Sequence, residues 1–199
     1  MNNPRLAAAA AVLLLSACEK PAGPAAASAN APAAVAASGT LVASALPALP
    51  TVTDPVFGPN FVDTAGTSNL FEIDEGKLAL DRSGNGQVKA FASMMIDAHT
   101  KSTAALQAAV EASGQTIDLP SALSDALQTK LGALTQTDAG AFDKTYMADQ
   151  VAAHESALDA LQSYARRGDM AALKKFAADT VPIVEDHLAR AKALQASLK

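Results

Sequence analysis

Hydrophobic residues recur at steps of three and four positions through most of the chain after residue 60, which is the period of an α-helix. The clearest stretch is 87–114, QVKAFASMMIDAHTKSTAALQAAVEASG, whose stripe is apolar except for His99 near its middle. The residues on this stripe are Val88, Phe91, Ala92, Met95, His99, Ser102, Leu106 and Val110. Two later stretches repeat the pattern with His154 and His187. All three histidines of the chain are therefore expected on helix faces that meet a core.

The same periodicity predicts long helices separated by turn signals, with a short helix in the middle of the domain. Their expected ranges are 60–82, 87–113, 121–134, 138–167 and 169–198. Ser121 is expected to cap the short helix and Asp138 the helix after it. Pro182 falls inside the last helix, where it should bend the axis. The pattern predicts an all-α fold, an antiparallel four-helix bundle with the short helix between the second and third long helices.

The N-terminal segment has the pattern of a bacterial lipoprotein signal. Residues 1–17 contain one basic residue, Arg5, and an apolar run that is too short to span a bilayer permanently. The four residues Leu15-Ser16-Ala17-Cys18 resemble a lipobox, in which the cysteine is lipidated and becomes the new N-terminus. The alternative is a plain secretory signal followed by a chance cysteine. We expect lipidation of Cys18, which is the only cysteine of the chain.

A lipidated Cys18 implies a protein of the bacterial cell envelope that faces the periplasm and has the membrane as a partner. Glu19 follows the cysteine, whereas an Asp at that position would resemble an inner-membrane retention signal, so the outer membrane is preferred. Residues 18–59 are rich in Ala, Pro and Ser and are expected to form a disordered tether. The folded domain is expected over residues 60–199.

The overall charge argues against one class of partner. The chain has a formal net charge of −5 and no cluster of basic residues, so nucleic acid is not expected as a partner.

Four segments carry a resemblance to a known family. They are FVDTAGTSNLFEIDEGKLAL (61–80), VKAFASMMIDAHTKS (88–102), AFDKTYMADQVAAHESAL (141–158) and LKKFAADTVPIVEDHLARAKAL (173–194). In order and spacing they resemble the bacterial family catalogued as domain of unknown function 4142, extracytoplasmic helical proteins related to the ferritin-like bundles. The resemblance implies a ferritin-like helical fold and an envelope address, and it implies no particular activity.

Counting residues from the connecting turns places the polar groups of the four long helices at similar heights. Glu72 and His99 differ by ~3 Å along the helix axes, and His154 and His187 by roughly 6 Å, once side-chain tilt is included. One carboxylate and three imidazoles are therefore expected to meet in the middle of the bundle. Such a set suits a divalent transition metal, namely Zn²⁺, Fe²⁺ or Cu²⁺.

Two interpretations of this cluster remain open at the level of sequence. The first is a metal site formed by Glu72, His99, His154 and His187. The second is a buried polar layer in which these groups satisfy one another and fix the helix register. Glu-x-x-His pairs, typical of ferritin-like di-metal sites, do not occur, so a di-iron oxygenase or ferroxidase is not expected. The positions three before the histidines are Ile96, Val151 and Val184.

Other catalytic patterns are missing from the sequence. There is no glycine-rich phosphate loop, no CxxC motif and no nucleophile elbow, so we predict no catalytic residues and favour a non-enzymatic protein. The acids that flank the histidines are expected on a solvated face or as hydrogen-bond partners of the rings. They are Asp97, Glu155, Glu185 and Asp186.

Two functions follow from these observations. The first is a lipid-anchored, non-enzymatic bundle that acts as an envelope interaction or stress-related module, with an envelope protein as partner. The second is a periplasmic metal-binding or redox protein that uses the Glu72 and histidine cluster.

Overall fold

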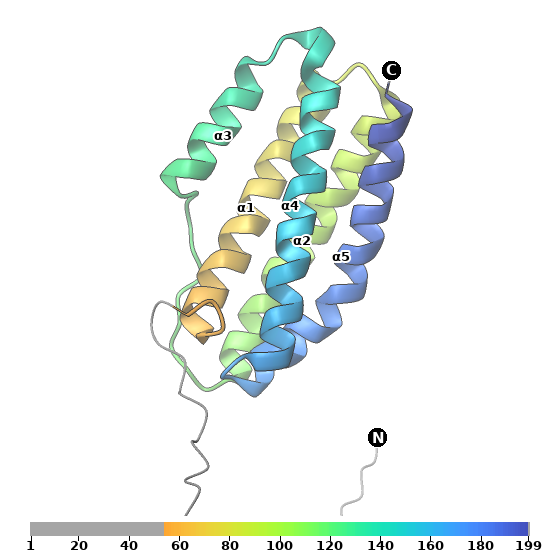
Figure 1. The fold of residues 1–199 in the computed structure, drawn as a ribbon. Helices are drawn as coiled ribbons and strands as arrows, with labels where there is room; N and C mark the ends of the chain where they lie inside the picture. Colours follow the sequence, from red (N-terminus) through yellow and green to blue (C-terminus); the bar gives the residue numbers. More distant parts are fainter. Residues whose placement is uncertain (1–53, 199) are drawn as a thin grey trace, which may run out of the picture. The chain divides into compact units, whose positions relative to one another are not determined.

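Five helices make up the part of the chain that the computed structural model describes, residues 54–198 (Figure 1). They are α1 (Gly58–Arg82), α2 (Gly86–Ala112), α3 (Asp125–Gln136), α4 (Ala139–Arg167) and α5 (Ala171–Ser197). These described residues contain no strand, so the all-α prediction is confirmed for them, together with the short helix between the second and third long ones. The predicted signal sequence, Cys18 and most of the predicted tether lie outside the described residues.

The long helices pack together as a bundle. α1 contacts α2 and α4, and α5 contacts the same two helices, so that each long helix has two long neighbours. The short α3 packs mainly on α1 and α4, at one side of the bundle (Figure 1). Within residues 54–198, no helix combines the length and the apolar character that a membrane span requires.

The helix ends follow capping chemistry, with two differences from expectation. The Asn85 side chain accepts hydrogen bonds from the backbone N–H groups of Gln87 at 2.8 Å and Val88 at 3.4 Å, which starts α2. α3 is capped by Ser124 and begins at Asp125, so the expected cap at Ser121 is wrong. Asp138 occupies the N-cap position before α4 as expected, but its side chain makes no capping hydrogen bond.

α1 begins before the expected start of the folded domain at residue 60. Asp54 accepts the backbone N–H of Val56 on its side chain at 3.0 Å and that of Phe57 on its carbonyl at 2.9 Å, which makes a turn ahead of the helix. Val56 is 5% exposed and packs in the core. Pro59 lies in the first turn of α1, where its missing N–H costs nothing. Residues 54–59, which the sequence placed in the tether, are therefore structured.

Arg82 fastens α3 to the end of α1. Its guanidinium donates hydrogen bonds to the carbonyl oxygens of Leu134 at 3.0 Å and Thr137 at 2.5 Å, which lie at the C-terminal end of α3. The same guanidinium lies 4.7 Å from the centre of the Phe142 ring. Because α3 makes few other contacts with the bundle, this residue is a main attachment of the short helix.

The core has two apolar halves with a polar layer between them. One cluster contains Val56, Phe61, Val62, Leu106, Val110, Leu161, Tyr164, Leu173, Phe176, Ala177 and Val184. The other contains Ala79, Val88, Phe91, Ala92, Met95, Leu134, Phe142, Tyr146, Met147 and Ala191. On each long helix the buried polar residues fall between the members of the two clusters. The polar layer therefore crosses the bundle at one level. Its polar groups are shielded from bulk water, so their hydrogen-bond partners must come from inside the bundle.

Candidate metal centre

The three histidines meet in the polar layer, each from a different helix. His99 lies on α2, His154 on α4 and His187 on α5. The ring centroids are 5.7 Å apart for His99 and His154, 6.1 Å for His99 and His187, and 5.5 Å for His154 and His187. One nitrogen from each ring lies within 4.8 Å of the other two. All three side chains are buried, with at most 8% of any of these residues exposed.

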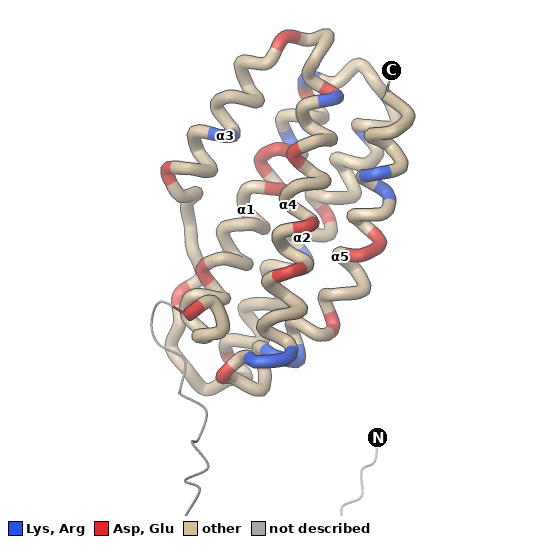
Figure 2. Tube along the Cα trace, in the orientation of Figure 1, with Lys and Arg blue, Asp and Glu red and all other residues tan. Residues whose placement is uncertain are grey.

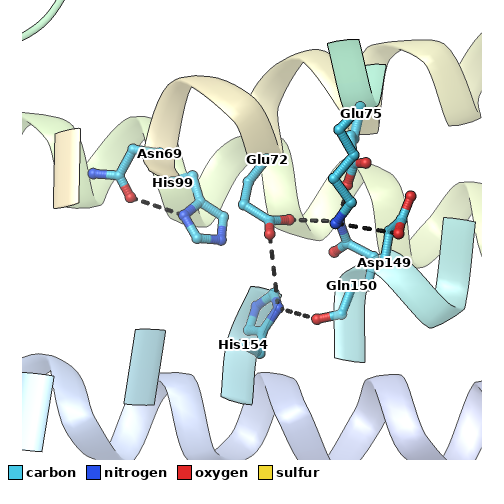
Figure 3. Close-up of polar contacts among 8 residues, drawn as sticks. Asn69, Glu72, Glu75, His99, Asp149, Gln150 and His154 are labelled. Carbon is cyan, nitrogen blue, oxygen red and sulfur yellow. Dashed lines mark hydrogen bonds and ion pairs between the residues drawn. The ribbon is translucent and has the colours of Figure 1, made fainter. Parts of the chain in front are cut away.

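A hydrogen-bond chain orients the His99 ring. Nδ1 of His99 lies 2.9 Å from Oδ1 of Asn69 (Figure 3). Nδ2 of Asn69 donates in turn to Oγ of Ser102 at 3.2 Å. Because the amide nitrogen of Asn69 is used as a donor, its oxygen must accept, so Nδ1 of His99 carries the proton. Nε2 of His99 is then an unprotonated acceptor. It is buried and has no hydrogen-bond partner among the described residues.

His154 shows the same arrangement with a different partner. Its Nδ1 lies 2.8 Å from the backbone carbonyl oxygen of Gln150, one helical turn earlier on α4. A carbonyl can only accept, so Nδ1 of His154 donates and Nε2 holds a free lone pair. Nε2 of His154 and Nδ1 of His187 are also buried without a partner in the part of the chain that the structure describes.

The electrostatic surroundings keep the three rings neutral. Burial, with a smaller contribution from the neighbouring histidines, lowers the pKa of His99 to about 3. Burial and His154 lower the pKa of His187 to about 4. Burial also lowers the pKa of His154, against the opposing effect of its hydrogen bond to Gln150. At neutral pH the layer therefore presents uncharged imidazoles, which is the form that binds metal ions.

Two buried carboxyl groups of α1 lie beside the histidines (Figure 3). Nε2 of Gln150 donates to Oε2 of Glu72 at 2.5 Å and to Oε2 of Glu75 at 3.0 Å. Oε1 of Glu72 lies 4.0 Å from Nδ1 of His154, which is too long for a hydrogen bond. Burial raises the pKa of Glu72 to about 8, and burial together with the charge of Glu72 raises the pKa of Glu75 to about 9.

The structure brings the sequence-predicted residues together, but not in equivalent roles. His99, His154 and His187 offer their nitrogens to a common point. Glu72 faces Nδ1 of His154, the nitrogen already engaged by Gln150, and so stands outside this group of ligand atoms. A layer in which Glu72 and the histidines satisfy one another is also not what the structure contains, because ring nitrogens and Oε1 of Glu72 lack partners among the described residues.

Sequence reasoning missed the residues that hold the site in place. Asn69, Ser102 and Gln150 orient the rings, and Glu75 completes the carboxyl pair. A usable signal did exist in the helix period. Gln150 is four positions before His154, so both lie on one helix face. A polar side chain on a core-facing stripe next to a histidine indicates a buried polar network, and here the Gln150 side chain donates to the two glutamates of α1.

The acids that flank the histidines belong to the surface, where charged residues of both signs occur along the helices (Figure 2). All of them are exposed, and all but Glu185 make ion pairs on the outside of the bundle. These pairs are Asp97 with Lys101 at 2.6 Å, Glu155 with Lys192 at 2.7 Å and Asp186 with Arg190 at 2.6 Å. Of the two expected roles, the solvated face is therefore confirmed.

A cavity of about 470 Å³ reaches the layer from the side of α1 and α4. Its lining includes His99, Asn69 and Ser102, and aromatic rings such as Phe61 and Phe71 form part of its wall. The cavity gives a small solute access to the hydrogen-bond chain that orients His99.

Comparison with known families gives one match for this chain. The family described as Domain of unknown function (DUF4142) matches residues 43–194, a span that contains the three histidines and the two buried glutamates. No curated protein and no solved structure matches the chain.

Proposed function

The chain belongs to the DUF4142 family, and within that family we propose that it binds one transition-metal ion between His99, His154 and His187. We further propose that the long helices form an antiparallel four-helix bundle of the ferritin-like kind. The contacts of each long helix with two others support this arrangement, as do the short connections between α1 and α2 and between α4 and α5.

One observation carries the metal proposal. Nε2 of His99 and of His154 are buried lone pairs without a partner among residues 54–198, while the opposite nitrogen of each ring is anchored by a hydrogen bond. Histidines that bind metals usually donate their other N–H to a carbonyl or carboxylate, which fixes the tautomer and the ring orientation. A purely structural layer gains nothing from leaving these acceptors empty, because each costs about 1–3 kcal/mol of desolvation.

The chemistry of the donors restricts the metal. Three neutral imidazoles suit Zn²⁺, Fe²⁺ or Cu²⁺. The distance from zinc to a histidine nitrogen is ~2.0–2.1 Å. Three protein ligands leave a fourth position for water or a small ligand. We propose a binding function and no catalysed reaction. Of the two functions left open by the sequence, metal binding is favoured because no described feature points to a protein partner.

The proposed cellular setting follows from the N-terminal sequence. A lipid chain on Cys18 would hold the metal-binding domain at the periplasmic face of the envelope, with the outer membrane preferred over the inner. The tether would give the domain reach from the lipid surface. In this setting the protein would sequester or hand on a metal ion in the periplasm.

Metal-dependent thermal stability tests the proposal. The full chain, purified without a histidine tag and stripped with a chelator, is melted with and without Zn²⁺, Fe²⁺ and Cu²⁺. At a free metal concentration about 100 times Kd, binding to the folded state raises the free energy of unfolding by ~2.7 kcal/mol. Met95→Ala is the matched control, because Met95 is fully buried on α2 one turn from His99 but offers no nitrogen. Metal should stabilise the wild type and Met95→Ala but not His99→Ala. No shift in the wild type, or an equal shift in His99→Ala, would contradict the proposal.

A further inference from the structure

We propose that Glu72, Glu75, Gln150 and Tyr146 form a second cation site beside the histidines, one that selects a hard divalent ion of the Mn²⁺ class. This site goes beyond the histidine centre, uses different ligand atoms and does not require the histidines to be occupied. It would make the polar layer a two-metal centre with a nitrogen side and an oxygen side.

The first observation is the convergence of two carboxyl groups from one helix face. Glu72 and Glu75 are three positions apart on α1, so their side chains emerge on the same side. A single amide nitrogen, Nε2 of Gln150, lies within 2.5 Å of one carboxyl oxygen and 3.0 Å of the other. The two carboxyl groups therefore share one small volume between α1 and α4.

The second observation is that four buried polar atoms of these residues have no hydrogen-bond partner in the part of the chain that the structure describes. They are Oε1 of Glu72, Oε1 of Glu75, Oε1 of Gln150 and the hydroxyl of Tyr146. Each belongs to a residue that is at most 1% exposed. Tyr146 precedes Gln150 by one helical turn on α4, and burial, followed by the charges of Glu72 and Glu75, raises the pKa of Tyr146. Tyr146 and Gln150 therefore lie on the same face of α4.

The third observation is the missing counter-charge. Lys130 of α3 is the basic residue whose charge acts on the pKa of both carboxyl groups. Its ammonium, however, is partly exposed and is paired with Asp149 at 3.2 Å. Among the described residues it makes no hydrogen bond to either glutamate. Without a cation, these two carboxyl groups must be protonated to remain in a dry interior, and a bound divalent ion would replace those protons with its own positive charge.

The ligand chemistry selects the kind of ion. Carboxylate, amide carbonyl and phenol oxygens suit hard cations such as Mg²⁺, Ca²⁺ and Mn²⁺. Rotation of the Gln150 amide by half a turn would turn its unpartnered oxygen toward the two carboxyl groups and complete the set. Oxygen ligands of this kind suit all three ions alike. Mn²⁺ is the ion to test because its binding can be followed directly by electron paramagnetic resonance.

Mn²⁺ binding to the full chain tests this second site, followed by electron paramagnetic resonance of the free ion. The histidine side is first removed with His99→Ala, so that any Mn²⁺ taken up reports on the oxygen ligands. In this background Glu75→Gln should weaken Mn²⁺ binding at least about tenfold, because it replaces a ligand charge with a neutral amide of equal size. Asp74→Asn is the matched control, since Asp74 is an exposed acid on the same helix, paired with Lys77. It should leave binding unchanged.

Each outcome is decisive for one of the two sites. If neither the wild type nor His99→Ala takes up Mn²⁺, or if Glu75→Gln binds it as tightly as its parent, the second site is wrong. Circular dichroism of each variant shows whether it is folded, and the wild-type titration overturns the proposal without any variant. Failure of the histidine centre gives a different result, because Zn²⁺ would then stabilise His99→Ala as much as the wild type.

Discussion

Asn69 of α1 holds the ring of His99 of α2, with 2.9 Å between Oδ1 of the amide and Nδ1 of the imidazole. The contact joins two helices across the polar layer and determines which ring nitrogen is left with a lone pair. It also lies on the wall of the cavity, where a solute can reach it. The histidine centre therefore depends on a residue that binds no metal itself.

Asn69→Ala should weaken Zn²⁺ binding without removing any ligand. Loss of the hydrogen bond frees the His99 ring to rotate and to change tautomer, and outer partners of this kind typically contribute 10–100-fold to metal affinity. The measurement is a competition titration against a chromophoric chelator. Ser68→Ala, at the adjacent position on α1, is the control and should bind as the wild type does. Equal affinities for Asn69→Ala and the wild type would show that the ring needs no such support.

The metal-free protein should be most stable near pH 6 and lose stability on both sides. The folded-state pKa values of Glu72 and Glu75 are raised to about 8 and 9, so the stability they contribute is present at low pH and is lost as the pH rises toward 9. The folded-state pKa values of His99 and His187 are lowered to about 3 and 4, so their contribution is lost as the pH falls below about 6.5.

Urea denaturation in the presence of a chelator, at a series of pH values, checks this profile. Glu75→Gln should flatten the alkaline limb by up to ~1.4 kcal/mol per pH unit, which corresponds to one proton. The exposed Asp74→Asn should leave the limb unchanged. An alkaline limb as steep in Glu75→Gln as in the wild type would mean that Glu75 does not hold a proton in the folded state.

Glu72 should couple energetically to Gln150 and not to His99. Its Oε2 accepts the Gln150 amide at 2.5 Å, whereas the histidine near its other oxygen is His154, at 4.0 Å. In double-mutant cycles of alanine variants, Glu72 and Gln150 should show a coupling of ~0.5–3 kcal/mol. Glu72 and His99 should be additive within about 0.5 kcal/mol. The reverse order of couplings would show that Glu72 and His99 share one interaction in the folded protein.

The folded domain should require residues 54–59. A fragment of residues 54–199 should unfold cooperatively, and removal of the first six residues should cost ~2 kcal/mol, because Val56 is buried and Asp54 makes the turn before α1. Val56→Ala in the longer fragment separates the packing contribution from that of the turn. If the fragment of residues 60–199 is as stable as the longer one, these residues pack on the bundle without supporting it.

Cys18→Ser should abolish lipid labelling and release the protein from the membrane fraction. Palmitate labelling of cells that express the wild type or the variant is the measurement. Continued labelling and membrane association of Cys18→Ser would contradict a lipid anchor at this residue.

The helices could be predicted from the sequence because each long one carries an apolar stripe with the helical period, and the histidines could be placed because they interrupt those stripes. The start of α1 could not be predicted in the same way. Pro55 and Pro59 resemble the end of a tether, but proline is also favoured in the first turn of a helix. Ser124 caps α3 instead of Ser121 because of where the chain between α2 and α3 packs. The hydrophobic periodicity of the sequence carries no information on that packing.

The site could be predicted only to the level of which helix faces meet. Residue counting puts Glu72 and the histidines at one height, but whether a carboxyl group points to a ligand nitrogen or to a neighbouring amide depends on side-chain torsions. Gln150 decides this case. Its side-chain amide donates to both carboxyl groups, and its backbone carbonyl accepts from Nδ1 of His154. A pairing of this kind appears only when the side chains are placed in three dimensions.

X-ray absorption at the zinc edge, on the full chain loaded with one equivalent of Zn²⁺, tests the central claim most directly. Binding by His99, His154 and His187 predicts a first shell with three imidazole nitrogens at ~2.0–2.1 Å and the multiple-scattering pattern of histidine rings. His154→Ala should reduce the number of imidazole ligands to two or abolish Zn²⁺ binding. A first shell of oxygen alone, or an unchanged spectrum in His154→Ala, would contradict the histidine centre.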